Sequence, residues 1–365
     1  MVTTSTPQEV PARTKAWSPA RKKTLLRIVA TVIMLAYSLI TLFPFYVLFV
    51  RTFVSTKESV NLHLWIPPQE DISLDAEVGN LSVNYNLDLR KVKEDLGIKG
   101  YVNPRESLRI LAGKNKITPE RMQQYFAGFA TFNGWITLLG NTTFWQSLIR
   151  TILITFASIV LLCFLSILTG VGLSGLRRRY QMAVYNVYLL QMVIPTIMII
   201  VPQFLTVQFV QNAIPGAKDA GPVRDAVQIL FLILIFVKGG ALSTMVFTTA
   251  INQVPSELEE SAYLDGATRW QFIWRILFPL LRVPIATVSV IMLPVFWNAF
   301  IEPFVYLDAN NATLLPVIAN YSGAYAVNYQ IIYTGVFVSV LPLLLVYLAL
   351  RKLFIRSVMA GAIKG

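Results

Sequence analysis

The hydrophobic positions of this chain gather in long continuous runs that alternate with shorter polar segments. A transmembrane helix needs about 20 apolar residues, and six runs approach or exceed that length: 28–50, 151–176, 182–209, 226–251, 283–307 and 331–350. Apolar residues do not alternate with polar ones inside the runs, so the pattern does not fit a membrane β-barrel. The pattern predicts an all-α polytopic membrane protein with six transmembrane helices.

The charged residues are few and unevenly placed. Of the 365 residues, 55% are hydrophobic and 14% are charged, and the mean hydropathy is +0.59. The net charge is +12, and outside the long segment 51–142 the Lys and Arg residues lie mostly before the first run, after the second, in the segment 252–281 and at the C-terminus. By the positive-inside rule, these parts and both termini are predicted to be cytoplasmic. The positive charge therefore reports orientation in a lipid bilayer, and we expect no nucleic-acid partner.

The polar segment 51–142 is too long for a simple loop between two spans. Three short amphipathic helices are predicted within it: one at 88–96, ended by Gly97, and two that begin near Pro104 and Pro119. Such helices indicate a small folded insert on the extracytoplasmic side rather than disorder.

These patterns together predict the organisation of the chain. The predicted parts are a basic cytoplasmic segment (1–27), a first transmembrane helix (28–50), a helical extracytoplasmic insert (51–142), a core with five transmembrane helices (143–354) that contains a cytoplasmic loop (252–281), and a cytoplasmic tail (355–365).

Residues that could carry out catalysis or bind a metal are scarce. Cys163 is the only cysteine and lies inside an apolar run, and His63 is the only histidine. These counts exclude a disulfide framework, a thiolate metal site and a convincing histidine-based triad. The chain also lacks the G-x-x-x-x-G-K-[ST] phosphate-binding loop. We expect no catalytic residue, no metal site and no ATP hydrolysis by this chain.

The segment 252–281, called the polar hairpin below, has the signals of two short helices. Ser256 with Glu259, and Thr268 with Gln271, predict two capping boxes. Asp265-Gly266 predicts a tight turn between the helices, and Pro279 is predicted to end the second one.

The second helix of the polar hairpin has an apolar face. Trp270, Ile273, Trp274 and Leu277 follow the spacing i, i+3, i+4 and i+7. Such a face fits the groove of a partner protein, and it also fits an interfacial helix resting on lipid headgroups. The residues by themselves favour neither.

The polar hairpin resembles the coupling loop of ATP-binding-cassette (ABC) importer permeases. That loop has the pattern Glu-Ala-Ala, three residues, Gly, nine residues, then Ile-x-Leu-Pro. Ser261 replaces the middle Ala and Phe278 replaces the Leu. The resemblance assigns the contact with the ATPase to Glu260, Ser261, Ala262, Asp265, Gly266, Ile276 and Pro279.

Two further stretches resemble carbohydrate importers of this family. Residues 297–303 are similar to its Trp-Asn-x-Phe-x-x-Pro stretch, and the chain ends like the maltose-transporter type of subunit. The second likeness implies that Gly361, Lys364 and Gly365 contact the ATPases. The resemblance covers about residues 25–65 and 140–365.

The resemblance implies one half of the permease of a type I importer in a bacterial or archaeal cell (inner) membrane. The implied partners are a second homologous permease subunit, two cytoplasmic ABC ATPase subunits that bind ATP and Mg, and an extracytoplasmic solute-binding protein. No cofactor is implied on this chain. The implied cargo is a sugar or oligosaccharide. The alternatives are a phosphorylated polyol such as glycerol phosphate, and an ion-coupled secondary transporter. The insert would either contact the binding protein or brace the spans.

Six residues are candidates for the translocation path: Lys238, Trp297, Asn298, Phe300, Glu302 and Tyr306. Charges inside apolar runs are often functional. At about 1.5 Å per residue, Lys238 and Glu302 differ in depth by about 12 Å, which disfavours a direct bridge. There are two alternatives to a place in the path. Lys238 would snorkel, and the aromatic residues would pack in the bundle or lie in an interfacial belt.

Overall fold

The structure is a computed structural model that describes residues 19–55, 61, 63–66, 72–85, 87, 89–238, 240–321 and 328–362, with side chains of 19–22 and 350–362 left out. These residues are helical or irregular, apart from one isolated antiparallel bridge between Glu77 and Ser107. The chain forms two compact units, residues 1–49 and 50–365. The first unit contains most of α1 (Pro19–Arg51), and every other element belongs to the second.

Among the described residues, four helical stretches are long and apolar enough to cross a membrane. They are Lys23–Arg51 in α1, α6 (Thr142–Ser174), α8 (Thr196–Ala213), and Tyr329–Ala349 in α17 (Tyr329–Ala362). Two bent pairs also pass together: α9 (Pro222–Val237) with α10 (Ala241–Ile251), bent by 56°, and Arg269–Leu280 with α14 (Arg282–Trp297), bent by 68°. Counting each pair as one span raises the total to six, the number predicted.

Besides the run 226–251, which is divided into α9 and α10, two predicted spans are interrupted. The run 182–209 is divided into α7 (Arg178–Val193) and α8, with Ile194 and Pro195 between them. Pro195 has no N–H for a helix ladder, which explains the break. The run 283–307 is helical only to Trp297 and resumes as the short α15 (Ile301–Tyr306). The expectation of one continuous helix was wrong at both places.

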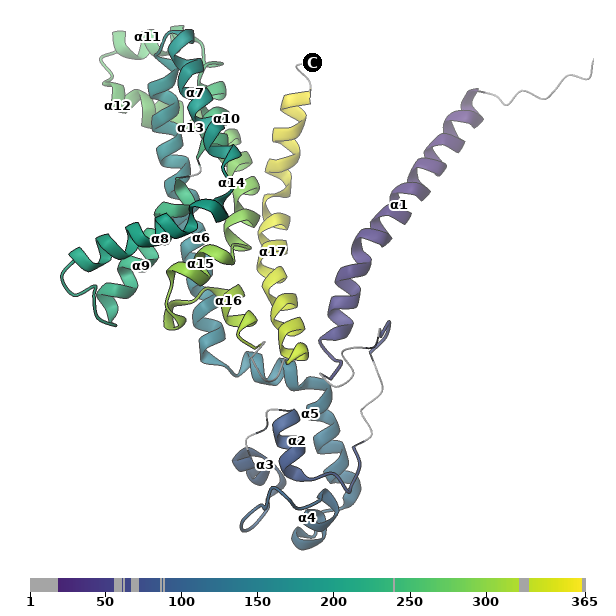
Figure 1. The fold of residues 1–365 in the computed structure, drawn as a ribbon. Helices are drawn as coiled ribbons and strands as arrows, with labels where there is room; N and C mark the ends of the chain where they lie inside the picture. Colours follow the sequence, from purple (N-terminus) through teal and green to yellow (C-terminus); the bar gives the residue numbers. More distant parts are fainter. Residues whose placement is uncertain are drawn as a thin grey trace, which may run out of the picture. The chain divides into compact units, whose positions relative to one another are not determined.

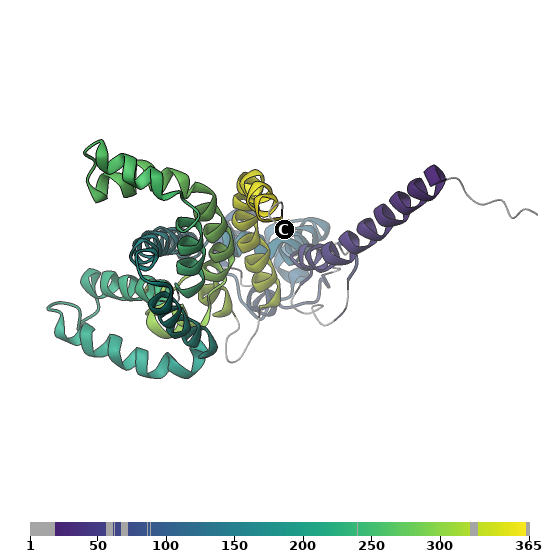
Figure 2. The same cartoon turned by 90° about the horizontal axis from the view of Figure 1, so that it is seen from above.

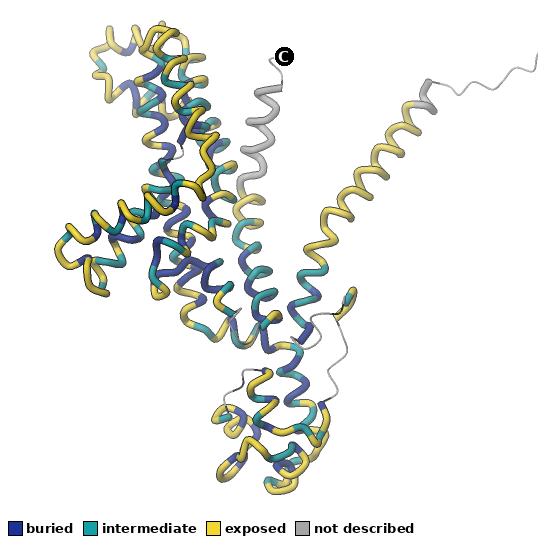
Figure 3. The backbone as a smooth tube through the Cα atoms, viewed as in Figure 1, coloured by how far each residue is buried: buried dark blue, intermediate teal, exposed yellow. Residues whose placement is uncertain are grey.

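Helix α6 is the central element of the second unit, and α10 lies beside it (Figures 1 and 2). Small residues allow this approach. The hydroxyl oxygens of Ser166 and Ser243 lie 2.7 Å apart. A Cβ on Gly170 would lie 3.3 Å from the backbone nitrogen of Thr248. The core around this contact also includes side chains from α9 and α14, and Figure 3 colours the chain by burial.

At the start of α6, polar contacts hold the segment 307–314, which contains the 3-10 helix η3 (Ala309–Asn311) and leads to α16 (Leu314–Ala319). The Arg224 guanidinium lies 2.8 Å from an Asp308 carboxylate oxygen. Arg150 donates to the carbonyl of Ala312 at 2.9 Å, and the Leu314 N–H donates to the Thr151 hydroxyl at 2.9 Å. This segment therefore has a fixed position against α6 and α9.

The described part of the insert contains four helices: α2 (Val78–Asn84), α3 (Leu89–Leu96), α4 (Leu108–Asn115) and α5 (Pro119–Leu139). The three predicted helices correspond to α3, α4 and α5, whereas α2 was missed and α5 is 21 residues long. Their inward side chains form a separate core with buried residues on all four helices. The prediction of a folded insert is confirmed.

The insert repeats itself with an offset of 30 residue numbers, since Val78 and Leu108 begin α2 and α4 while Leu89 and Pro119 begin α3 and α5. Reciprocal backbone bonds join the two copies. The Val78 N–H donates to the Glu106 carbonyl at 2.9 Å, and the equivalent Leu108 N–H donates to the Ala76 carbonyl at 3.1 Å. One residue further on, the Gly79 N–H donates to the Pro104 carbonyl at 2.7 Å, and the Arg109 N–H donates to the Leu74 carbonyl at 2.9 Å. The buried pairs keep the offset: Val78 and Leu108, Leu81 and Leu111, Val92 and Met122, Leu96 and Phe126. The two copies therefore pair with approximate two-fold symmetry.

The insert is joined firmly to α17. The buried Gln330 amide donates to the carbonyls of Ala130 (3.0 Å) and Thr131 (2.7 Å) on α5 and of Thr52 (3.3 Å). A Cβ on Gly134 would lie 2.5 Å from the Thr334 hydroxyl and 2.8 Å from the Gln330 carbonyl. Helices α5 and α17 are thus so close at this point that a residue larger than glycine at position 134 would clash with α17.

Two glycines of α5 make this joint testable, because they predict opposite effects. Gly134→Ala should lower stability by about 1–3 kcal/mol, since the new methyl group meets the backbone of α17. Gly128→Ala is the matched control. A Cβ there meets nothing within 4 Å, so the helical preference of Ala should raise stability by roughly 0.5–1 kcal/mol. Thermal unfolding of the purified chain in detergent measures both, and shifts of equal sign and size would contradict the close joint.

Candidate functional site

The polar hairpin consists of α11 (Ser256–Leu264), a turn, and a continuous helical stretch made of α12 (Arg269–Gln271), the π-helix η2 (Phe272–Leu277) and α13 (Phe278–Leu280). Gly266, at φ 82°, ends α11. Its N–H donates to the Tyr263 carbonyl at 3.0 Å, and the Ala267 N–H donates to the Ala262 carbonyl at 2.9 Å. These two bonds make a Schellman motif, for which glycine is the favoured residue. The predicted tight turn is confirmed.

One of the two predicted capping boxes forms. The Gln271 N–H donates to the Thr268 hydroxyl at 3.3 Å, and the Thr268 N–H donates to the Gln271 side chain at 2.7 Å. The box predicted at Ser256 was wrong, because Pro255 precedes the helix and Ser256 is its first residue. Glu259 instead accepts a hydrogen bond from the Tyr263 hydroxyl at 2.8 Å. This bond raises the pKa of Tyr263, with smaller contributions from burial and the Glu259 charge.

Pro279 does not end the second helix, contrary to the prediction. It lies inside α13, and the helix continues to Leu280. The stretch just before it is a π-helix, in which the Phe278 N–H donates to the carbonyl of Ile273, five residues back. The wider turn accommodates a residue that has no N–H and whose ring crowds the preceding turn of an α-helix.

The second helix of the hairpin divides its apolar residues between two surroundings. Ile273 and Leu277 are buried in the core of the chain itself. Trp270, 60% exposed, and Trp274 stack with their rings 2° from parallel. The prediction of one apolar face available to a partner was therefore wrong for half of its residues. The buried half anchors the hairpin to the core.

Helix α11 is almost wholly exposed. Ala262 is its one buried residue, whereas Leu264 is 88% exposed, and Leu258 and Tyr263 are exposed as well. Among the family-pattern residues, Glu260, Ser261 and Asp265 are exposed and Ile276 is partly buried. An ordered helix with apolar residues in solvent has the character of a docking surface. Of the predicted tail contacts, Gly361 belongs to α17, while Lys364 and Gly365 lie outside the described residues.

Lys238 lies in the short break between α9 and α10. Its carbonyl accepts a hydrogen bond from the Gln191 amide at 2.6 Å. Its Nζ atom is buried and has no hydrogen-bond partner among the described residues. Among the described residues, no salt bridge joins Lys238 to Glu302, as the difference in depth predicted. A buried ammonium without a hydrogen-bond partner is energetically costly.

The other candidate path residues fall into two groups. Trp297 is buried and its indole N–H donates to the Ser339 carbonyl at 3.0 Å. Tyr306 is also buried, and its hydroxyl lies 3.1 Å from the Gln203 side-chain oxygen. Their contacts favour packing of the bundle. Asn298 and Phe300 are exposed, and Phe300 stacks on Phe304 with ring centres 5.6 Å apart. These two and the partly buried Glu302 remain accessible.

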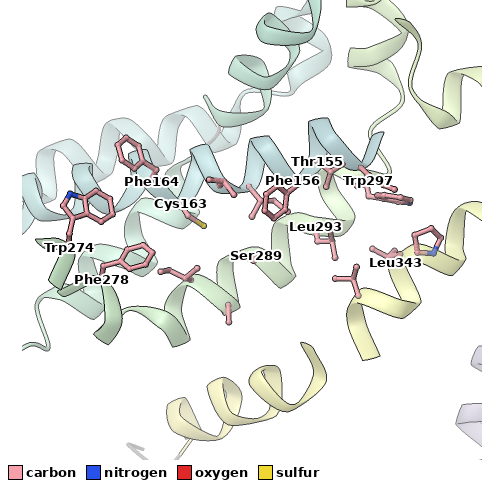
Figure 4. A pocket seen from close by; sticks show the side chains of 17 residues that line it. Thr155, Phe156, Cys163, Phe164, Trp274, Phe278, Ser289, Leu293, Trp297 and Leu343 are labelled. Carbon is pink, nitrogen blue, oxygen red and sulfur yellow. The ribbon is translucent and has the colours of Figure 1, made fainter. Parts of the chain in front are cut away.

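A large apolar groove of about 790 Å³ opens between α6, the end of the polar hairpin, α14 and α17 (Figure 4). Phe156 and Phe164 of α6 and Leu293 of α14 lie along it, and Cys163 and Ser289 are among its few polarisable or polar groups. The sequence did not reveal this groove, because a run that is apolar on all sides does not show which side lacks a partner within the chain.

The spans, the helix breaks and the exposed hairpin define a polytopic helical membrane protein. The chain belongs to the family of binding-protein-dependent transport system inner membrane components, whose model matches residues 163–359. That match includes the polar hairpin, Lys238 and the stretch 297–306.

Several relatives in this family are sugar permeases. The probable starch degradation products permease AmyC of Thermoanaerobacterium thermosulfurigenes is 24% identical over 62% of this chain and 79% of its own. The lactose permease LacG of Rhizobium radiobacter is 27% identical over 60% and 74%. The melibiose/raffinose/stachyose permease MelC of Bacillus subtilis is 30% identical over 62% and 77%.

A solved structure has the same fold. It is a bacterial ABC transporter involved in the import of the acidic polysaccharide alginate, and the chain compared is 17% identical to this one. The TM-score is 0.58, with 93% of this chain and 99% of the other covered. The coverage is greater than that of the sequence relatives, so the likeness in fold extends beyond the family model.

The left-handed conformation of Gly266 leads to a local prediction. A Cβ there meets nothing within 4 Å, so Gly266→Ala should cost only the backbone term, roughly 1–2 kcal/mol. Amide exchange in residues 262–267 should then become about 5- to 30-fold faster. Gly172→Ala, in a helix and equally free of neighbours, should leave exchange in the hairpin unchanged. Unaltered exchange in Gly266→Ala would contradict the left-handed turn.

Proposed function

We propose that this chain is one permease subunit of an ATP-driven ABC importer for a sugar or oligosaccharide. The observation that carries the proposal is the exposed α11 within a chain that belongs to a transport permease family. The three relatives named above transport starch degradation products, lactose, and melibiose, raffinose or stachyose, according to their names. None of these names indicates a phosphorylated polyol, and we therefore place sugars first.

The polar hairpin is proposed as the docking site for the cytoplasmic ATPase subunits, which would bind ATP and Mg. The chain has no phosphate-binding loop of its own, so hydrolysis must take place on a partner. Leu258, Tyr263 and Leu264 offer an apolar surface, and the anchored Ile273 and Leu277 hold it in place. The positive-inside rule would set this end and both termini in the cytoplasm.

Two further partners follow from the remaining surfaces of the proposed importer. The apolar groove of Figure 4 suits a helix of a second permease subunit, because its lining offers packing surface and few hydrogen-bonding groups. The insert lies at the start of α6 and the hairpin packs at its other end (Figure 1). The insert would then face the extracytoplasmic side, where a solute-binding protein delivers the sugar.

The proposal is tested by purifying the chain with its neighbouring gene products and measuring uptake of radiolabelled sugars into liposomes. The complex should contain an ATPase, and uptake should require ATP inside the liposomes without any ion gradient. An ion-coupled secondary transporter would instead need the gradient and no ATPase. Uptake driven by an ion gradient in the absence of ATP would overturn the proposal.

The coupling role of the hairpin predicts a specific loss. Leu264→Asp places a charge in the most exposed apolar position of α11 and should weaken ATPase binding by about 10-fold or more, equivalent to about 1.4 kcal/mol. Val83→Asp is the matched control, since Val83 is 80% exposed in the insert. Both variants should insert and fold normally, and ATPase retention on the purified chain measures the difference. Equal retention would remove α11 from the interface.

Lys238 predicts opposite changes in stability and transport. Lys238→Met removes a buried ammonium that lacks a hydrogen-bond partner, so the thermal midpoint should rise. If Lys238 lines the proposed path, ATP-driven uptake should fall several-fold at the same time, the pattern expected of a costly residue kept for function. A more stable variant with normal uptake would assign Lys238 to the packed bundle.

A further inference from the structure

The two-fold repeat of the insert ends where α5 outgrows its counterpart. Helix α3 ends at Leu96, whereas α5 continues beyond the equivalent Phe126 to Leu139. A cleft of about 220 Å³ lies between α3 and this extension. Lys91 and Val92 of α3 line one side, and Tyr125, Phe129 and Asn133 of α5 line the other. The cleft thus arises at the point where the repeat is no longer symmetric.

Asn133 gives the cleft an unpaired hydrogen-bond donor. The residue is 2% exposed. Its side-chain oxygen accepts the Thr137 hydroxyl at 2.9 Å, while its amide nitrogen has no hydrogen-bond partner among the described residues. This nitrogen is therefore available as a donor to an acceptor in the cleft. Because Asn133 lines the cleft, an acceptor on a ligand there would satisfy it.

Two aromatic rings lie next to this donor. The rings of Tyr125 and Phe129 are 5.0 Å apart at an angle of 58°. The Tyr125 hydroxyl donates to an Asp95 carboxylate oxygen at 2.8 Å. Burial raises the pKa of Tyr125, as do the hydrogen bond to Asp95 and its charge, so the phenol stays protonated and keeps its bond. The ring is therefore fixed in position, and the exposed Lys91 adds further donors at the rim.

We propose that this cleft binds one sugar unit of the transported saccharide before it enters the membrane. The inference rests on the proposed function. A pyranose has apolar C–H faces that pack on aromatic rings and hydroxyl oxygens that accept from amide and ammonium donors. Tyr125 and Phe129 supply the aromatic rings, and Asn133 and Lys91 supply the amide and ammonium donors. The cleft is smaller than the roughly 300–1,000 Å³ of sites for drug-sized ligands, so it holds one ring and not a chain.

The test uses the full chain in nanodiscs of phospholipids that carry no sugar headgroup. Maltotriose, lactose and raffinose serve as probes, and saturation-transfer NMR titrations report contact between protein and sugar protons. The wild type should show saturable transfer to ring protons for at least one of them. Phe129→Ala removes a ring, and Asn133→Leu removes the amide while keeping similar volume. Each should raise the apparent Kd by about 10-fold, equivalent to about 1.4 kcal/mol.

Tyr101→Ala is the matched control, because Tyr101 is an aromatic residue of the insert that is 86% exposed and lies outside the cleft. Its titration should equal that of the wild type. Amide exchange of the insert core checks that Asn133→Leu still folds, and Phe129→Ala provides an independent readout. Transfer that is absent in the wild type, or unchanged in both cleft variants, would overturn the inference.

The outcome is separable from that of the proposed function. If the assembled complex takes up one of these sugars but the wild-type chain shows no saturable transfer to it, the cleft inference alone fails. If the complex takes up none of a broad set of sugars, the proposed function fails, and the cleft inference fails with it even where a sugar binds.

Discussion

The close contact between α6 and α10 is the interaction on which the rest of the core depends. Lipid surrounds both helices with hydrocarbon as apolar as their own side chains, so burial of apolar area does little to bring them together. Their approach depends on shape instead. Ser166 and Gly170 on α6 face Gly240, Ser243 and Thr248, and the two serine hydroxyls bond across the seam. Helix α6 has 33 residues and is about 50 Å long, and the insert, the segment 307–314 and the polar hairpin are all positioned along it.

The helix breaks follow from the same need to satisfy polar groups inside a membrane. A backbone N–H or carbonyl left free near a break must find a partner in the protein. At the α9–α10 break the Gln191 amide donates to Lys238, and beyond α14 the Gln228 side-chain oxygen accepts the Asp308 N–H at 3.2 Å. These bonds come from helices distant in sequence. The breaks are therefore held by tertiary structure, and they place Lys238 and Asn298 at ends of helices.

The sequence predicted the features that depend on local chemistry. The long apolar runs, the Gly266 turn and the Thr268 cap all appear in the structure. The break at Pro195 was missed because proline is no reliable guide in membrane helices: Pro202 and Pro342 lie inside α8 and α17. Helix α2 was missed because its polar, glycine-containing sequence is typical of a loop, and pairing with its copy 30 residues later stabilises it. The cleft at Asn133 depends on α3 and α5 meeting in space, which no local pattern indicates.

The shape of the polar hairpin, which we propose as a docking surface, does not depend on a partner. Its shape is set within the chain by the Schellman motif at Gly266, the cap at Thr268 and the buried Ile273 and Leu277. None of these contacts requires Leu264 of α11, which is exposed. η2 and α13 lead to α14 through a single corner residue, Leu281, and Leu281 is buried. The corner between the hairpin and α14, bent by 68°, is therefore packed into the core as well.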